Sequence, residues 1–346
     1  MKTAPPLPAA DLDHILTHTR RYWEELRHSR IFVTGGTGFF GCWLVESFCH
    51  ADNELDLGAE LVVLTRNPAG FREKLPHLAT RKGLILHEGD VRDFPFPAGA
   101  FTHIIHGATT SSAPVAPAVM LQTITSGTRR VLDFAATCGA KKLLYVSSGA
   151  VYGRQPPDLP SIPETHTGAP DPTNTESAYG EGKRLGELLC VLAQEQFGLE
   201  TKIARCFAFV GPHLPLNAHF AMGNFLRDAI AGSPIRVSGD GTPVRSYLHA
   251  ADLAVWLWTI LFQGSPARAY NVGGGEAVAL GELATLVDRS GPHPQGVQMA
   301  TRPADHSLPS RYVPDISRAN EELGLRQLVP LEDAIKRTVR WLTTNS

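Results

Sequence analysis

Short apolar segments alternate with longer amphipathic segments through the first two hundred residues. Apolar runs predict strands over residues 31–33, 61–64, 84–86, 103–106 and 142–146. Helical spacing predicts helices over residues 40–50, 119–138 and 178–196. The strands are apolar throughout rather than alternating, which is typical of a parallel sheet covered on both faces. Right-handed crossovers then predict a doubly wound α/β fold.

The segment before the first strand, residues 11–29, also has helical spacing of apolar residues. We interpret it as one amphipathic helix appended to the fold, which either covers a core edge or contacts a second copy. Residues 155–175 are rich in Pro, Thr and Asp and predict a surface loop. After about residue 211 the composition changes to more Pro and Gly, with short strands and helices.

The composition is ordinary for a soluble globular protein, because 43% of the 346 residues are hydrophobic and 19% are charged. A formal net charge of -2 offers no large basic surface to nucleic acid, and no apolar run approaches bilayer length. Residues 1–10 lack the apolar core of a signal peptide. The five cysteines form no CxxC pair, so we expect neither a zinc site nor a disulfide framework. We therefore expect a cytoplasmic, reduced protein without a bound metal.

A glycine-rich turn, Gly35-x-x-Gly38-x-x-Gly41, follows the first predicted strand and opens the first predicted helix. Glycines allow a tight turn and close approach of backbone to a pyrophosphate, and a helix N-terminus attracts negative charge. The pattern predicts a Rossmann dinucleotide site. Its contacts are expected at Thr34, Gly35, Gly38, Phe39, Phe40 and Gly41.

This motif also divides the chain. We expect an N-terminal helical extension over residues 1–29 and a dinucleotide-binding Rossmann domain over residues 30–205. Residues 206–346 are expected to form mainly a smaller C-terminal α/β substrate-binding domain, with some segments returning to the Rossmann domain.

Two positions bear on the identity of the dinucleotide. Arg66 follows the second strand, where an acidic residue would bind the ribose 2′-hydroxyl of NAD. It could pair with the 2′-phosphate of NADP, so NADP is slightly favoured over NAD; alternatively, Arg66 stacks on adenine or is solvated. After the third strand, Asp90 and Val91 are expected at the adenine. A carboxylate there can accept a hydrogen bond from the adenine amino group. The alternative is that Asp90 caps its own loop.

Tyr179 and Lys183 are four residues apart on a predicted helix, so their side chains share one face. A phenol has a free pKa of about 10, and a nearby ammonium and an oxidised nicotinamide would lower it. Tyr179 can then take a proton from a substrate alcohol while the nicotinamide takes the hydride. Lys183 can also hold the nicotinamide ribose. Ser148, at the end of the fifth strand, is placed to orient the substrate oxygen.

The polar loop after the fourth strand, residues 106–112, lies at the carboxyl edge of the sheet, where ligands bind in such folds. We expect Ala108 and Thr109 at the cofactor and Ser111 at the substrate. The alternative is that these residues belong to a solvated loop.

Together these motifs resemble the extended short-chain dehydrogenase/reductases, in particular the NAD(P)-dependent nucleotide-sugar epimerase/dehydratase family. The resemblance runs from about Arg30 to the C-terminus and includes the segments IARCFAFVGP (203–212), GDGTPVRSYLH (239–249), YNVG (270–273) and RPAD (302–305). It implies that the C-terminal part binds a nucleoside diphosphate sugar. Asn224, Arg245 and Arg302 are the implied contacts, and the arginine fork suits phosphate oxygens. The resemblance also implies a homodimer formed through a helix pair that includes the helix of Tyr179.

The sequence departs from this family immediately after the catalytic hydroxyl. The 4,6-dehydratases carry an acid pair there, and the decarboxylases keep a glutamate at the second position, whereas this chain has Gly149 and Ala150. Neither residue can transfer a proton. Ala208 also stands where many relatives have an asparagine that contacts the substrate phosphate, and another usual asparagine is missing near residues 123–125.

The remaining residues favour chemistry that needs only hydride transfer and the Ser148, Tyr179 and Lys183 set. This chemistry is that of a nucleoside diphosphate sugar 4-epimerase or 4-ketoreductase. One alternative is a 4,6-dehydratase or decarboxylase whose acid/base groups come from elsewhere, such as the loop after Gly107. Another is a non-catalytic dinucleotide-binding regulator.

Overall fold

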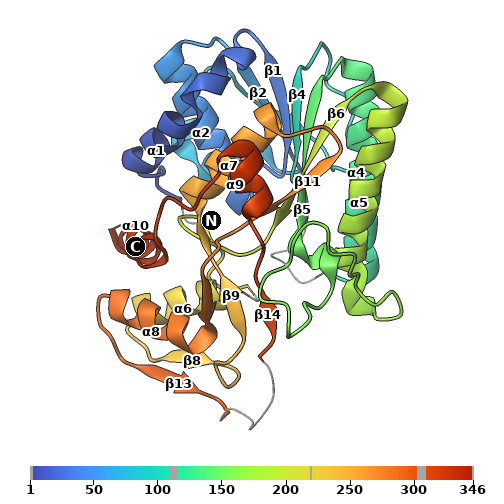
Figure 1. The fold of residues 1–346 in the computed structure, drawn as a ribbon. Helices are drawn as coiled ribbons and strands as arrows, with labels where there is room; N and C mark the ends of the chain where they lie inside the picture. Colours follow the sequence, from blue (N-terminus) through green and yellow to red (C-terminus); the bar gives the residue numbers. More distant parts are fainter. Residues whose placement is uncertain (1–2, 110–114, 219, 302–308, 345–346) are drawn as a thin grey trace.

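The computed structural model describes residues 3–109, 115–218, 220–301 and 309–344, and its larger domain is built on a parallel sheet (Figure 1). The sheet has seven strands in the order β11-β6-β5-β4-β1-β2-β3. The strands are β1 (Arg30–Thr34), β2 (Glu60–Thr65), β3 (Leu84–Glu88), β4 (His103–His106), β5 (Lys142–Ser148), β6 (Glu200–Cys206) and β11 (Arg268–Val272). The strand order reverses between β1 and β4, which is where such sheets bind ligands. The predicted doubly wound α/β fold is confirmed.

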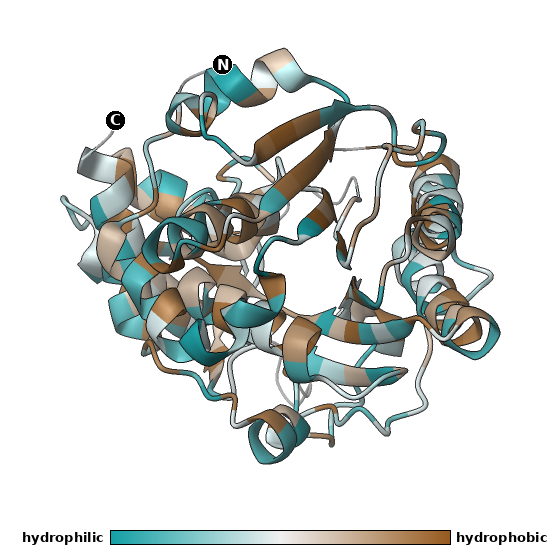
Figure 2. Ribbon diagram, turned by 90° about the horizontal axis from the view of Figure 1, so that it is seen from above, coloured by the Kyte–Doolittle hydropathy of each residue, from teal (hydrophilic) through white to brown (hydrophobic). Residues whose placement is uncertain are grey.

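Helices cover both faces of this sheet. One face carries α1 (Ala9–Thr19), α2 (Phe39–Leu55) and α7 (Ala250–Gln263), and the other carries α4 (Pro117–Cys138) and α5 (Ala178–Phe197) (Figure 1). Ile31 and Val33 of β1 enter the core under the first group, and Phe32 enters the core under the second. This two-sided burial is why the strands are apolar throughout. Figure 2 shows the mixed hydropathy of the surrounding helices, which face both core and solvent.

The N-terminal segment is part of the first core. Trp23 is fully buried and lies 4.6 Å, between ring centroids, from Trp258 of α7. The prediction of one continuous helix is wrong, because α1 ends at Thr19 and a 3-10 helix, η1 (Arg20–Leu26), follows. Thr19 Oγ1 donates to the Ile15 carbonyl oxygen at 2.6 Å and accepts from Trp23 Nε1 at 2.8 Å. These bonds turn Trp23 into the core at the point where the α-helix ends.

The other predicted elements are present. β4 has the predicted bounds and the rest have shifted ends, the largest shift being at α2, which runs to Leu55 instead of ending at residue 50. The hydrophobic pattern of the sequence does not predict strands β6 and β11, which complete the sheet. Shorter elements of the larger domain are α3 (Pro68–Lys74), α9 (Ser317–Leu323), and the 3-10 helices η2 (Pro76–Leu78), η3 (Gly149–Tyr152) and η4 (Thr175–Ser177).

A smaller lobe lies below the sheet domain in Figure 1 and has its own apolar core. Its helices are α6 (Ala221–Ile230), α8 (Leu280–Ser290) and α10 (Leu331–Thr344). Its short strands are β7 (Phe209–Val210), β8 (Ile235–Val237), β9 (Val244–Ser246), β10 (Leu248–His249), β12 (Ala277–Ala279), β13 (Val297–Met299) and β14 (Arg311–Tyr312). Within residues 206–346, α7, β11 and α9 pack with the larger domain instead. The pairing of β14 with β9 sets Tyr312 opposite Arg245.

Candidate active site

The three predicted catalytic side chains meet at the carboxyl end of β5. Ser148 is the last residue of this strand, and Tyr179, in the first turn of α5, lies next to the serine side chain. Lys183, one turn further along α5, donates from Nζ to the carbonyl oxygen of Val146 at 2.7 Å. The spacing of four residues on a helix thus brings a phenol and an amine to the same strand end.

Burial sets the protonation of these groups. It raises the pKa of Tyr179 to about 12, and the neighbouring Ser148 side chain offsets part of the rise. Burial lowers the pKa of Lys183 to about 8, because an ammonium ion loses its hydration in the interior. Tyr179 is therefore a neutral proton donor in the protein alone. A positive charge beside it, such as an oxidised nicotinamide, would favour the phenolate and make the same residue a base.

An ion pair between Glu187 and Arg205 joins α5 to β6. Glu187, one turn beyond Lys183, accepts hydrogen bonds from Arg205 Nη2 at 2.6 Å and from Arg205 Nε at 3.0 Å. Glu187 Oε1 also accepts from Ser147 Oγ at 2.6 Å. Arg205 in turn donates to the Tyr152 hydroxyl at 2.9 Å. These contacts join α5 to β5 and β6 in one orientation.

The glycines of the predicted dinucleotide turn have different roles. Gly35 has φ of +77°, and a Cβ there would lie 2.7 Å from the Gly107 backbone. A Cβ on Gly41 would lie 2.2 Å from the carbonyl oxygen of Gly35, so glycine lets the helix pack on its own turn. Gly38 is exposed, and a Cβ there would meet no described atom closer than 3.4 Å. The described part of the fold does not itself require glycine at position 38, and the free space there fits a pyrophosphate.

The N-terminus of α2 is open to an anion. Its first turn, which includes Phe39 and Phe40, has no side-chain cap from any described residue, so backbone N–H groups remain available. Lys74 Nζ donates to the Thr37 carbonyl oxygen at 3.0 Å and holds the turn from the side. The Phe40 ring packs edge-on against Phe209, with centroids 5.0 Å apart. The turn and helix therefore fit the pyrophosphate of a dinucleotide.

Thr34 and Ala108, both predicted at the cofactor, are joined beneath the turn. The Ala108 N–H donates to Thr34 Oγ1 at 3.1 Å, and Thr34 Oγ1 lies 2.7 Å from His106 Nδ1. His106 Nε2 lies 3.1 Å from Thr128 Oγ1. Burial lowers the pKa of His106 to about 3, so this imidazole is neutral and links the ends of β1 and β4. Sequence reasoning missed His106, because its partners come from other strands and helices.

The residues predicted at the adenine end lie beyond β2 and β3. Arg66 is exposed directly after β2. Asp90 accepts from Arg92 Nε at 2.8 Å and from Arg92 Nη2 at 3.1 Å. The hydrogen bonds from Arg92 lower the pKa of Asp90, and the charge of Arg66 also lowers it. The Asp90 carboxylate is therefore charged. Val91 is buried and packs against Gly127. A Cβ on Gly127 would lie 2.9 Å from the Val91 side chain.

The predicted substrate contacts are distributed over both domains. Of these, Ser111 and Arg302 lie outside the described residues. Thr109, which is predicted at the cofactor, has its Oγ1 3.9 Å from the Met120 sulfur. Asn224, on α6, accepts from Arg227 Nη1 at 3.2 Å.

Arg245, on β9, donates from Nη1 to the Val244 carbonyl oxygen at 2.8 Å. Burial lowers the pKa of Arg245, and no carboxylate of a described residue lies within ion-pairing distance of it. This half-buried cation is therefore suited to an anionic ligand.

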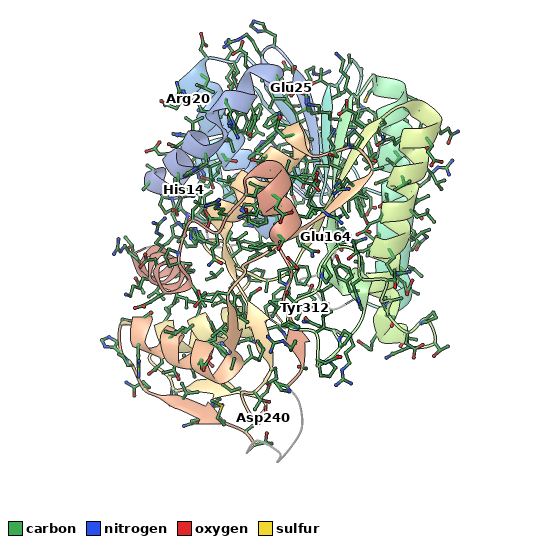
Figure 3. All side chains as sticks on the ribbon, in the orientation of Figure 1. His14, Arg20, Glu25, Glu164, Asp240 and Tyr312 are labelled. Atoms are coloured by element: carbon green, nitrogen blue, oxygen red, sulfur yellow. The ribbon has the colours of Figure 1, made fainter. Side chains whose placement is uncertain are left out.

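Sequence reasoning also missed Tyr312. Its side chain lies next to Ser148, and a Cβ on Gly149 would lie 2.7 Å from its hydroxyl oxygen. Its ring packs on Phe207, with centroids 4.6 Å apart. Figure 3 shows Tyr312 where the β14 segment meets the loop that follows β5. Its approach depends on the pairing of β14 with β9, which the sequence pattern did not indicate.

Two features that would indicate other kinds of function are absent from the described residues. No helix in them is both long enough and apolar enough to span a bilayer. They also contain no group of three or more His, Cys, Asp or Glu side chains arranged to hold a metal ion.

A doubly wound sheet, a glycine turn opening α2 and a Ser/Tyr/Lys set at the end of β5 define an extended short-chain dehydrogenase/reductase. The chain belongs to the NAD dependent epimerase/dehydratase family, whose model matches residues 31–273.

Similar proteins include several nucleotide-sugar enzymes. UDP-glucuronic acid decarboxylase 1 of Arabidopsis thaliana is 31% identical over 312 residues, covering 90% of this chain and 69% of that protein. The structure of the dTDP-glucose 4,6-dehydratase DesIV of Streptomyces venezuelae, with NAD and TYD bound, is 27% identical with a TM-score of 0.75, covering 91% of this chain and 97% of that one. The UDP-N-acetylglucosamine 4-epimerase of Methanobrevibacter ruminantium, at 20% identity and a TM-score of 0.79, covers 92% and 100% and shows the same fold.

The glycine turn yields a prediction that separates folding from ligand binding. Gly38→Ala should change the free energy of unfolding by less than about 1 kcal/mol, because the added methyl group meets only ordinary contacts. It should weaken NAD+ and NADP+ binding about tenfold or more, because the methyl group occupies the pyrophosphate position. Calorimetric titration and thermal unfolding measure the two effects.

Gly41→Ala is the matched control, since its Cβ collides with the protein itself and should lower both stability and binding. Unchanged dinucleotide affinity in Gly38→Ala would place the pyrophosphate elsewhere.

Proposed function

We propose that this protein is an NAD(P)-dependent enzyme that transfers a hydride at a sugar carbon of a nucleoside diphosphate sugar, as a 4-epimerase or 4-ketoreductase. The main support is that Ser148, Tyr179 and Lys183 are assembled while Gly149 and Ala150 follow the serine. The set serves alcohol oxidation and carbonyl reduction, and neither neighbour offers a proton.

In the proposed mechanism a bound nicotinamide supplies the hydride acceptor or donor. Ser148 donates a hydrogen bond to the substrate oxygen and orients it. Tyr179 takes the hydroxyl proton when the carbon is oxidised and returns a proton when the carbonyl is reduced. Lys183 is buried, which lowers its pKa to about 8. On the same helix face as Tyr179, it would hold the nicotinamide ribose and, when protonated, would favour the phenolate. Arg245 is the proposed partner for the substrate diphosphate.

A decarboxylase or dehydratase is the second candidate, and it is favoured by the curated relatives, several of which are named UDP-glucuronic acid decarboxylases. Those reactions need an additional proton-transferring group. The side chains at 149 and 150 supply none, so the group would have to come from elsewhere, such as the loop after Gly107. Residues 110–114 of that loop lie outside the described residues.

A substrate panel separates these reactions and tests the mechanism. The protein is incubated with UDP-glucose, UDP-N-acetylglucosamine, UDP-glucuronic acid, dTDP-glucose and a 4-keto sugar nucleotide, with either dinucleotide, and the products are identified by mass and chromatography. An isomer of unchanged mass, or a reduced product formed with NAD(P)H consumption, supports the proposal. Loss of water or of carbon dioxide identifies the second candidate.

Tyr179→Phe should lower turnover by about 10²-fold to 10⁴-fold while dinucleotide binding is retained, because the proton donor is lost but the turn is intact. Tyr22→Phe, on the η1 helix, is the matched control. Normal turnover in Tyr179→Phe would exclude this mechanism. A panel without any product would favour the non-catalytic regulator.

We further propose that Arg66 allows the protein to use NADP. The similar structures named with a dinucleotide contain NAD or NADH, so the support for NADP is the exposed guanidinium directly after β2. Arg66→Ala should weaken NADP+ binding about tenfold to a hundredfold, the scale of one charged hydrogen bond, and leave NAD+ binding nearly unchanged. Arg72→Ala, an exposed arginine on α3, is the control. Equal losses for both dinucleotides would contradict a 2′-phosphate contact.

A homodimer through α4 and α5 is proposed from their exposed apolar side chains. Leu185, Leu188 and Leu192 of α5 are 43%, 53% and 47% exposed, and Val119 and Leu121 of α4 are also exposed. Such a stripe is suited to a second copy of the same helix pair. Leu188→Glu should convert a dimer to a monomer in sedimentation analysis, whereas Leu328→Glu, at an exposed leucine elsewhere, should not. A monomeric unmodified protein would contradict the proposal.

A further inference from the structure

Two tyrosine hydroxyls, from different domains, converge on one serine. Tyr179 reaches Ser148 from α5, and Tyr312 reaches it from β14 of the smaller lobe. The Tyr312 oxygen would lie 2.7 Å from a Cβ on Gly149, so it fills the space in which a side chain at 149 would begin. Packing of its ring on Phe207 holds it there.

The hydrogen-bonding capacity of Ser148 limits what the two phenols can do. A serine hydroxyl has one hydrogen to donate and two lone pairs to accept with. The Ala150 N–H occupies one lone pair, at 3.1 Å. When both phenols bond to Ser148, one of them donates to the second lone pair and the other receives the serine hydrogen.

The proposed mechanism requires the one hydrogen of Ser148 to point away from Tyr312, toward Tyr179 and the substrate oxygen. We propose that Tyr312 is a positioning residue, which donates its hydroxyl hydrogen to Ser148 Oγ and thereby directs the serine hydrogen to Tyr179 and the substrate oxygen. In its use of a substrate oxygen this inference rests on the proposed function, but the coupling of Tyr312 to Tyr179 through Ser148 does not require a substrate.

The surroundings of Tyr312 are compatible with a permanent donor. Burial raises the pKa of Tyr312 well above its ordinary value, so the phenol keeps its hydrogen. Burial likewise raises the pKa of Cys206, which faces both tyrosines, and leaves a neutral thiol there. The Arg245 guanidinium carbon lies 6.0 Å from the Tyr312 ring centroid, and Lys183 lies on the Tyr179 side.

The test is the ionisation of Tyr179 in the protein saturated with NAD+, followed by tyrosinate absorbance as the pH is raised, with Tyr179→Phe identifying its contribution. Tyr312→Phe keeps the ring on Phe207 but removes the hydroxyl. The serine hydroxyl is then less strongly polarised and free to rotate, so the Tyr179 phenolate is less stabilised. The midpoint of Tyr179 ionisation should move up by about half a pH unit or more.

Two further variants keep this test decisive. Gly149→Ala pushes the Tyr312 hydroxyl aside without deleting it and should shift the midpoint in the same direction, whether or not Tyr312→Phe folds well. In a Ser148→Ala background, Tyr312→Phe should cause no additional shift, because the coupling passes through the serine. Tyr247→Phe removes another buried tyrosine hydroxyl from the same lobe and is the control. An unchanged midpoint in Tyr312→Phe would overturn the inference.

Where the panel identifies a substrate, Tyr312→Phe should lower kcat about tenfold with KM within about twofold, and shift the alkaline rise of kcat to higher pH. A larger effect on KM than on kcat would show a binding role instead and overturn the positioning role. Absence of any turnover would count against the proposed function, while the tyrosinate titration would still decide the coupling.

Discussion

The proposed catalytic arrangement depends on how α5 is rotated against the sheet, and the ion pair of Glu187 and Arg205 fixes that rotation. Burying two charges costs several kcal/mol per ion, which the mutual attraction offsets only when the remaining hydrogen-bonding groups are satisfied. Here the carboxylate receives two guanidinium N–H groups and the Ser147 hydroxyl. Tyr179, Lys183 and Glu187 follow one another at intervals of four residues and share one helix face. A helix anchored at Glu187 therefore presents the other two side chains to the end of β5.

Hydrogen bonds connect the same ion pair to the segment that follows β14. Arg205 donates to the Tyr152 hydroxyl, which donates to Asn271 Oδ1 at 2.8 Å. Asn271 Nδ2 in turn donates to the carbonyl oxygens of Ile162, at 2.8 Å, and Asp315, at 3.0 Å. Asp315 lies three residues beyond Tyr312. The network thus positions both tyrosines of the active site, one through α5 and the other through the segment after β14.

The parts of the site that the sequence predicted are those whose geometry is local. The glycine turn lies within seven residues, and the Tyr179 and Lys183 pair lies within one helical turn, so spacing alone indicates which groups meet. His106, Glu187 and Tyr312 could not be identified in this way, because each acquires its role from partners brought in by tertiary packing. The single-helix prediction for residues 11–29 failed for a related reason. At Thr19 the side chain bonds backbone and indole, and the packing of Trp23 outweighs helical spacing.

Gly149 and Ala150 stand where the resemblance would place acidic residues, and their packing bears on the reaction. Phe207 and Tyr312 occupy the space in front of Gly149, each within 2.7 Å of where a Cβ would lie, so a carboxylate side chain could enter there only if both rings moved. At position 150 the backbone N–H is committed to Ser148. Gly149 and Tyr312 thus depend on each other, because the absence of a side chain at 149 leaves room for the tyrosine. A neutral phenol therefore occupies the space that an acidic side chain at 149 would need. In the proposed mechanism a phenol beside Ser148 assists oxidation and reduction at the carbon whose oxygen Ser148 orients, whereas elimination and decarboxylation place further demands on proton transfer. The packing around Ser148 therefore supports the proposal that hydride transfer is the complete reaction.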